Sequence, residues 1–246
     1  MMFLNMDLFT WALLILSLVA VPIMGRREIR DLQRDLARGI QDARSRVYEK
    51  AMLFAWGQAI LLVAIWLMMG RGLGEIGLVP VAEGWQWLWI AVSLVVAGFF
   101  VQQARQATSD PEQLEELRDQ LGALAAVVPH TARELRGFSK VSFTAGICEE
   151  ILYRGLLLTS LAALIGTWPA VLASSLVFGL GHSYQGLSGV GRTGLVGLVL
   201  ATIVVLTGSL FTAMLIHIVL DVVQGRMAYA AVNSAPQPGE LALDAA

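Results

Sequence analysis

Residues 141–165 read VSFTAGICEEILYRGLLLTSLAALI, an apolar stretch that carries two glutamates and an arginine. A bilayer core of about 30 Å is crossed by about 20 mostly apolar helical residues, so this stretch is long enough to span a membrane. Each ionisable side chain at the centre of such a helix costs about 2.5–3.5 kcal/mol on the insertion scale. The presence of Glu149, Glu150 and Arg154 in this stretch therefore points to a function.

The composition of the whole chain is also suited to a bilayer. Of its 246 residues, 57% are hydrophobic and 15% are charged, whereas soluble domains are about 45–50% apolar and about 25% charged. We predict an all-α fold, a polytopic transmembrane helix bundle of about seven spans. The predicted spans are residues 8–24, 51–70, 85–102, 141–165, 168–183, 190–206 and 209–224.

Lysine and arginine are concentrated in the loops of one side of this predicted bundle. Residues 25–50 hold eight of the 17 basic residues and residues 103–140 hold five, whereas Arg71 lies in a loop of the opposite side. Loops rich in lysine and arginine face the cytoplasm. We therefore expect an integral protein of a bacterial inner membrane, with the N-terminus outside and the C-terminus in the cytoplasm.

The segments between the spans suggest three parts of the chain. Residues 26–48 and 111–125 show the apolar periodicity of helices among charged residues, which predicts two cytoplasmic helices. Residues 227–246 lack such periodicity and are expected to form a disordered cytoplasmic tail. The predicted parts are residues 1–138 with three spans and the helical loops, residues 139–226 with four spans, and the tail.

The last four predicted spans hold all the ionisable residues that lie within spans. These residues form three groups on separate helices, and two of the three histidines of the chain are among them. With the orientation above, all three groups lie in the cytoplasmic half of the bilayer. The sequence predicts one polar site that opens toward the cytoplasm, built from Glu149, Glu150, Arg154, His182, His217 and Asp221.

The spacing within the groups favours pairs on one helix face. Glu150 and Arg154 are separated by four residues, as are His217 and Asp221, and this spacing places two side chains together on a helix. Glu149 is rotated by about 100° from Glu150 around the helix axis. We predict that Arg154 holds Glu150, while Glu149 stays available for chemistry.

Three motifs, in this order, resemble those of a known family. GICEEILYRG at residues 146–155 is similar to the Glu-Glu-x-x-x-Arg motif of the CPBP family, the type II CAAX prenyl endopeptidases and their bacteriocin-processing relatives. FGLGH at residues 178–182 resembles the family's Phe-x-x-x-His motif, and HIVLD at residues 217–221 resembles its His-x-x-x-Asn/Asp motif. The resemblance covers about residues 139–226 and implies an intramembrane glutamate protease.

The resemblance also implies roles for individual residues. Glu149 and His182 match the pair that activates the attacking water, and His217 and Asp221 match positions that stabilise the oxyanion. The third motif of the family more often ends in Asn, so Asp221 either donates when protonated or orients a cationic His217; we prefer the second role. The implied catalytic residues are Glu149, His182, His217 and Asp221, and the supporting residues are Glu150, Arg154 and Phe178.

These groups are sufficient for peptide hydrolysis without a cofactor. Two histidines and a glutamate can also ligate zinc, so a zinc-dependent membrane protease is an alternative, although no His-Glu-x-x-His motif is present. A catalytically inactive membrane scaffold or immunity-type binding protein and, less favoured, a proton-coupled transporter are the others. With a net charge of −2, the chain gives no sign of a nucleic-acid partner. The expected partners are the lipid bilayer and a peptide or protein substrate, and no oligomeric state is predicted.

Overall fold

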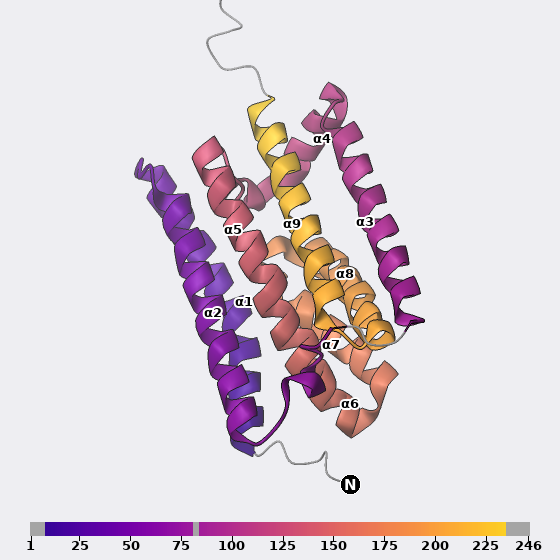
Figure 1. Ribbon diagram of the computed structural model, residues 1–246. Coiled ribbons are helices and arrows are strands. Elements are labelled where there is room, and N and C mark those ends of the chain that lie inside the picture. The colour runs from indigo at the N-terminus through magenta and orange to yellow at the C-terminus, as the bar shows by residue number, and fades with distance from the viewer. Residues whose placement is uncertain (1–7, 81–83, 235–246) are drawn as a thin grey trace, which may run out of the picture.

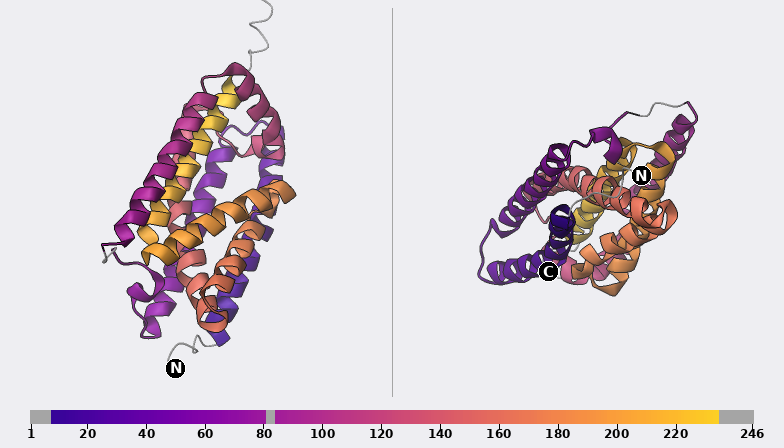
Figure 2. Two further views of the ribbon diagram at one scale, coloured as in Figure 1. Left: turned by 90° about the vertical axis from the view of Figure 1, so that its right-hand side faces the viewer. Right: turned by 90° about the horizontal axis from the view of Figure 1, so that it is seen from below.

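The structure, a computed structural model, describes residues 8–80 and 84–234. Within these ranges every regular element is a helix, which confirms the predicted all-α class, and the long helices pack side by side as a bundle (Figure 1 and Figure 2). The helices are α1 (Leu8–Ala37), α2 (Ala43–Met68), η1 (Leu73–Ile76), α3 (Gln86–Ala107), α4 (Pro111–Leu121), η2 (Gly122–Ala126), α5 (Ala132–Glu149), η3 (Glu150–Leu158), α6 (Thr159–Ile165), α7 (Thr167–Gly181), η4 (Ser183–Gln185), α8 (Gly186–Thr207) and α9 (Leu210–Asn233).

Four helical segments among the described residues are long and apolar enough to cross a membrane. They are α2, α3, α9 and the continuous stretch of η4 and α8. The apolar α7 is shorter, with 15 residues. All seven predicted spans fall on helices, but the predicted count of about seven membrane crossings is not confirmed.

The N-terminal helix is longer than predicted. α1 continues from the predicted first span to Ala37 and α2 begins at Ala43, so the helical structure predicted for residues 26–48 is confirmed except at the turn between the two helices. The break comes at a turn in which Gly39 has a φ of 75°, a conformation that favours glycine. Across this hairpin Lys50 Nζ lies 3.7 Å from Glu28 Oε2. The charged residues therefore link two antiparallel helices.

The helix predicted for residues 111–125 is confirmed for most of its length. Asp110 caps α4, because its side chain accepts hydrogen bonds from the backbone N–H groups of Glu112 and Gln113. Pro111 occupies the first helical position, where its missing N–H costs nothing. α4 ends at Leu121, and a short 3₁₀ turn, η2, follows it and packs on α4.

α5 and α9 change the predicted division of the chain. α9 is helical to Asn233, so the disorder predicted for residues 227–246 is wrong for the first part of that range; residues 235–246 lie outside the described residues. Small side chains explain the extra turns, since Ala228 and Ala231 are buried where α9 packs against α4 and α5. The boundary predicted after residue 138 falls inside α5, which crosses it without interruption.

One unbroken helix carries the first motif. α5, η3 and α6 follow one another from Ala132 to Ile165, and η3 is a π-helix of nine residues. The π-helix begins at Glu150, so its wider turn starts directly after Glu149. Segments of this kind are rare and occur frequently at functional sites.

The helices before and after residue 134 share one apolar core. Its buried members include Leu14 of α1, Leu62 and Trp66 of α2, Ile76 of η1 and Ala97 of α3, together with Leu152, Phe178, Leu200 and Ile216 of the later helices. Two hydrogen bonds add to this contact at the start of α9. The Leu210 N–H donates to the Gly77 carbonyl at 2.8 Å, and the Ser209 hydroxyl donates to the Val79 carbonyl at 2.7 Å.

Candidate active site

The structure brings the seven predicted site residues together from three parts of the chain. Four of them form a group with little exposure, which we call the buried cluster: Glu150, Arg154, Phe178 and His217. The other three are partly exposed and form what we call the open cluster: Glu149, His182 and Asp221. Both clusters therefore draw residues from the same three segments: α5–η3, the end of α7 and the middle of α9.

Glu150 is the centre of the buried cluster. Its Oε1 accepts a hydrogen bond from Arg154 Nη1 at 2.7 Å, which confirms the pair predicted from their spacing. The same oxygen lies 2.7 Å from His217 Nδ1, whose N–H donates to it. This second bond was not predicted from the sequence, because it joins two helices that are far apart in the chain.

Phe178 is the member of the buried cluster that contacts both Arg154 and, in the open cluster, His182. The Arg154 guanidinium sits over its ring, 4.1 Å from the centroid, in a cation–π contact. The rings of His182 and His217 pack on it at centroid distances of 4.8 and 5.9 Å. In addition, His182 Nδ1 donates to the Phe178 carbonyl at 2.9 Å, which leaves Nε2 of that ring facing the site.

α8 closes the buried cluster at Gly197. Arg154 Nη2 donates to the Gly197 carbonyl at 3.2 Å. A Cβ atom at this position would lie 3.0 Å from Phe178 Cδ1 and 3.4 Å from Arg154 Nη2. The missing side chain thus allows the backbone of α8 to satisfy a buried guanidinium, a role that the three motifs do not indicate.

Glu149 is the centre of the open cluster. Its Oε2 lies 3.9 Å from Nε2 of both His182 and His217. This separation is too long for a direct hydrogen bond and suits a bridging oxygen. Oε2 is buried and has no hydrogen-bond partner, although the side chain as a whole is 28% exposed. The prediction that Glu149 points away from the Glu150–Arg154 pair is confirmed.

Asp221 lies at the edge of the open cluster, with a side chain that is 33% exposed. Its Oδ2 is 3.7 Å from His217 Nε2, which is beyond hydrogen-bond distance. The orientation of His217 that we predicted from Asp221 comes instead from Glu150, whose carboxylate reaches the opposite ring nitrogen. Asp221 contributes charge at a distance rather than a hydrogen bond.

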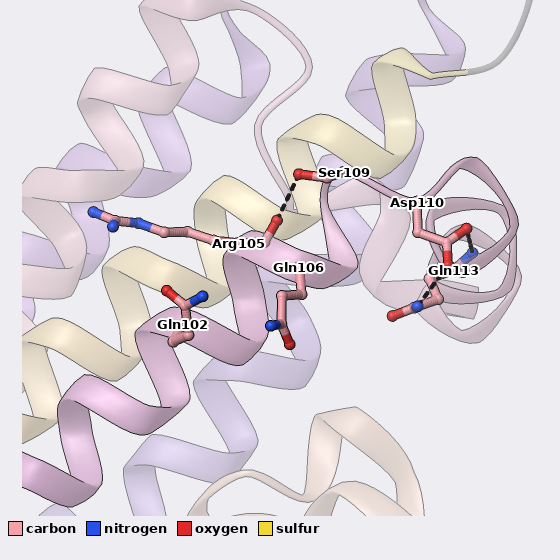
Figure 3. A pocket seen from close by; sticks show the side chains of 6 residues that line it. All are labelled: Gln102, Arg105, Gln106, Ser109, Asp110 and Gln113. Carbon is pink, nitrogen blue, oxygen red and sulfur yellow. Dashed lines mark hydrogen bonds between the residues drawn. The ribbon is translucent and has the colours of Figure 1, made fainter.

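Two further features bear on other kinds of site. Within residues 8–80 and 84–234, no group of three or more His, Cys, Asp or Glu side chains is arranged to hold a metal ion. An open polar pocket of about 470 Å³ lies at the corner of α3 and α4. Figure 3 shows hydrogen bonds between some of the residues that line it. The pocket contains none of the seven site residues; its lining is Gln102, Arg105, Gln106, Ser109, Asp110 and Gln113.

Comparison with curated proteins and with solved structures gives no match. A family model, type II CAAX prenyl endopeptidase Rce1-like, matches residues 134–223. The matched segment contains all three motifs and both clusters. The family is one of proteases, and the four apolar helical segments are those of an integral membrane protein. Residues 134–223 therefore match the Rce1-like model of the type II CAAX prenyl endopeptidases, which confirms the resemblance carried by the three motifs.

Proposed function

We propose that this protein is an intramembrane endopeptidase that hydrolyses a peptide bond of a membrane-associated peptide or protein, with Glu149 as the general base. The observation that carries the proposal is the unpaired Oε2 of Glu149, which faces the Nε2 atoms of His182 and His217 at 3.9 Å. A carboxylate oxygen with a free lone pair beside two imidazoles is suited to bind a water molecule and take its proton.

In the proposed reaction the water gives a proton to Glu149 while its oxygen attacks the carbonyl carbon of the substrate. His182 presents Nε2 to the same water, because its other nitrogen is fixed by the Phe178 carbonyl. When the tetrahedral intermediate collapses, the carbon–nitrogen bond breaks and Glu149 returns the proton to the leaving amine. A positioned general base of this kind contributes about 10²–10⁴-fold to a rate.

The buried cluster supports the oxyanion side of this reaction. His217 donates through Nδ1 to Glu150, and its Nε2 faces Glu149 and Asp221 at 3.9 and 3.7 Å. Three carboxylates around one ring stabilise the imidazolium form. Its Nε2–H then provides a donor for the negative charge that develops on the substrate oxygen.

We further propose that the site opens toward the cytoplasm of a bacterial inner membrane, with the N-terminus outside. The α1–α2 turn, α4 and the end of α9 lie at the same end of the bundle, the upper end in Figure 1. Residues 25–50 and 103–140, which hold most of the basic residues, reach this end. The distribution of positive charge supports a cytoplasmic location for it.

The proposal is tested by comparing peptide termini in membranes of cells that express the wild-type protein or Glu149→Gln. The substitution keeps the shape of the side chain and removes its basicity. We expect a set of new termini that occurs with the wild-type protein alone, while both proteins accumulate in the membrane and unfold at the same temperature. Identical termini in the two samples would show that the protein acts as a scaffold or binding protein instead.

A farnesylated peptide that ends in a CAAX sequence is the first synthetic probe, because the matched family is named for such substrates. The same assay separates the glutamate mechanism from the zinc alternative. With Glu149 as base, hydrolysis continues in the presence of a chelator. Loss of hydrolysis with the chelator and its return with added Zn²⁺ would support the zinc-dependent protease.

A further inference from the structure

Tyr153 has a buried hydroxyl that makes no hydrogen bond. The residue is 2% exposed, and its hydroxyl oxygen has no partner. Leaving a buried polar group unpaired costs about 1–3 kcal/mol. Phenylalanine would fill the same space without this cost, so the hydroxyl calls for an explanation in the function of the site.

The hydroxyl of Tyr153 lies beside the second motif, residues 178–182. The ring packs edge-on against Phe178, with 4.9 Å between ring centroids. Its hydroxyl lies against Gly181, where a Cβ atom would be 2.8 Å from the oxygen. Gly181 directly precedes His182, so the hydroxyl reaches the level of the histidine that faces Glu149.

Two carboxylate oxygens on the same helix are also buried and unpaired, Oε2 of Glu149 and Oε2 of Glu150, and the helical spacing favours Glu149 as the match. Glu149 lies four residues before Tyr153 on the same unbroken helix, and helical side chains tilt toward the N-terminus, which here is toward Glu149. A phenol donates a hydrogen bond and a carboxylate accepts one, so the two unpaired atoms are complementary.

We propose that Tyr153 is a positioning residue for Glu149. In the working enzyme its O–H donates a hydrogen bond to the Glu149 carboxylate and fixes the oxygen that takes the proton from water. The inference rests on the proposed function and adds a residue for which the three motifs specify no side chain. Because protein encloses the hydroxyl, it does not touch the substrate, and its effect falls on kcat rather than on KM.

Tyr153→Phe is the direct test, since it removes one oxygen atom. The substrate is a synthetic peptide spanning a cleavage site found by the comparison of termini. We expect kcat to fall about 10–100-fold, since a misplacement of about 1 Å costs about 10²-fold, with KM unchanged and no loss of thermal stability. Tyr229→Phe on α9 is the matched control and should keep the wild-type kcat. A wild-type kcat in Tyr153→Phe would overturn the inference.

Gly181→Ala tests the same contact from the other side. The added methyl group displaces the Tyr153 hydroxyl and meets other atoms only at 3.8 Å, which is ordinary contact. We expect Gly181→Ala to lower kcat as Tyr153→Phe does, and the double variant to be no slower than Tyr153→Phe alone. If Gly181→Ala lowers kcat equally in both backgrounds, the hydroxyl does not mediate its effect and the inference is wrong.

Glu149→Gln in the same assay separates the two proposals. If Glu149→Gln hydrolyses the peptide as fast as the wild-type protein, the general-base proposal itself fails. If Glu149→Gln is inactive and Tyr153→Phe has the wild-type kcat, the general-base proposal stands and the role of Tyr153 alone is refuted.

Discussion

Glu149 and Glu150 are neighbours in the chain and lie in opposite environments. Glu150 is 0% exposed and binds both Arg154 and His217 through one oxygen. Glu149 is partly exposed. Each residue has one oxygen, Oε2, without a hydrogen-bond partner. A single step along the helix thus separates a fully buried carboxylate that links η3 to α9 from a partly exposed one that makes no direct hydrogen bond through Oε2. On the function proposed above, the buried cluster carries stability and the open cluster carries reactivity.

Arg154→Met tests the stability side of this comparison. It removes the closest cation of the buried Glu150 carboxylate and leaves His217 as its one remaining partner among the described residues; breaking a buried pair costs about 3–5 kcal/mol. We expect the free energy of unfolding in detergent to fall by this amount and hydrolysis to be lost. Arg192→Met, at an exposed position of α8, is the matched control. Glu150→Gln added to Arg154→Met should recover part of the stability; no recovery would show that Arg154 stabilises the fold mainly by packing on Phe178.

His182→Ala tests the reactivity side. His182 belongs to the open cluster, and its ring nitrogen faces Glu149 rather than a buried charge. We expect kcat to fall about 10²–10³-fold, within the range of acid–base groups, with little change in thermal unfolding. A kcat within tenfold of the wild type, or a large loss of stability, would contradict the division between the clusters.

Gly197→Ala places a methyl group between α8 and the buried cluster. The new Cβ would lie 3.0 Å from Phe178 Cδ1, and overpacking of this kind costs about 1–3 kcal/mol. We expect a lower unfolding temperature and a smaller loss of activity than in Arg154→Met. Gly57→Ala on α2, where a Cβ meets nothing within 4 Å, is the control and should be neutral. Equal effects of the two substitutions would mean that α8 does not pack closely against the buried cluster.

Asp221→Asn should have the smallest effect. The side chain makes no hydrogen bond to His217, and an amide keeps its shape and can donate to the oxyanion. We expect kcat to change by less than about tenfold, or about 1.4 kcal/mol in activation free energy. A loss of 10²-fold or more in the hydrolysis assay would assign Asp221 an essential negative charge.

Much of the fold and of the site could be predicted from the sequence, because helical periodicity determines contacts within a single helix. Four-residue spacing predicted the Glu150–Arg154 pair, and one residue of helical rotation predicted the separate direction of Glu149. The cap of α4 is equally local, because Asp110 and Pro111 form it. Each of these features depends only on residues within two turns of one helix.

The features that were missed depend on contacts between helices. The bond from His217 to Glu150 joins residues 67 positions apart, and no spacing within a helix predicts it. Periodicity also gives no sign of the π-helix after Glu149. The role of Gly197 appears only once α8 is placed against Arg154.

The tether between Ser209, Leu210 and residues 77–79 sets a limit on dissection of the protein. Cutting the chain down to the matched residues 134–223 would remove the two carbonyl acceptors at the start of α9 and leave Trp66 and Ile76 out of the apolar core. In such a fragment, the apolar side chains that pack against Trp66 and Ile76 would become exposed. The smallest unit that can be purified in working form is therefore larger than the unit that defines the family.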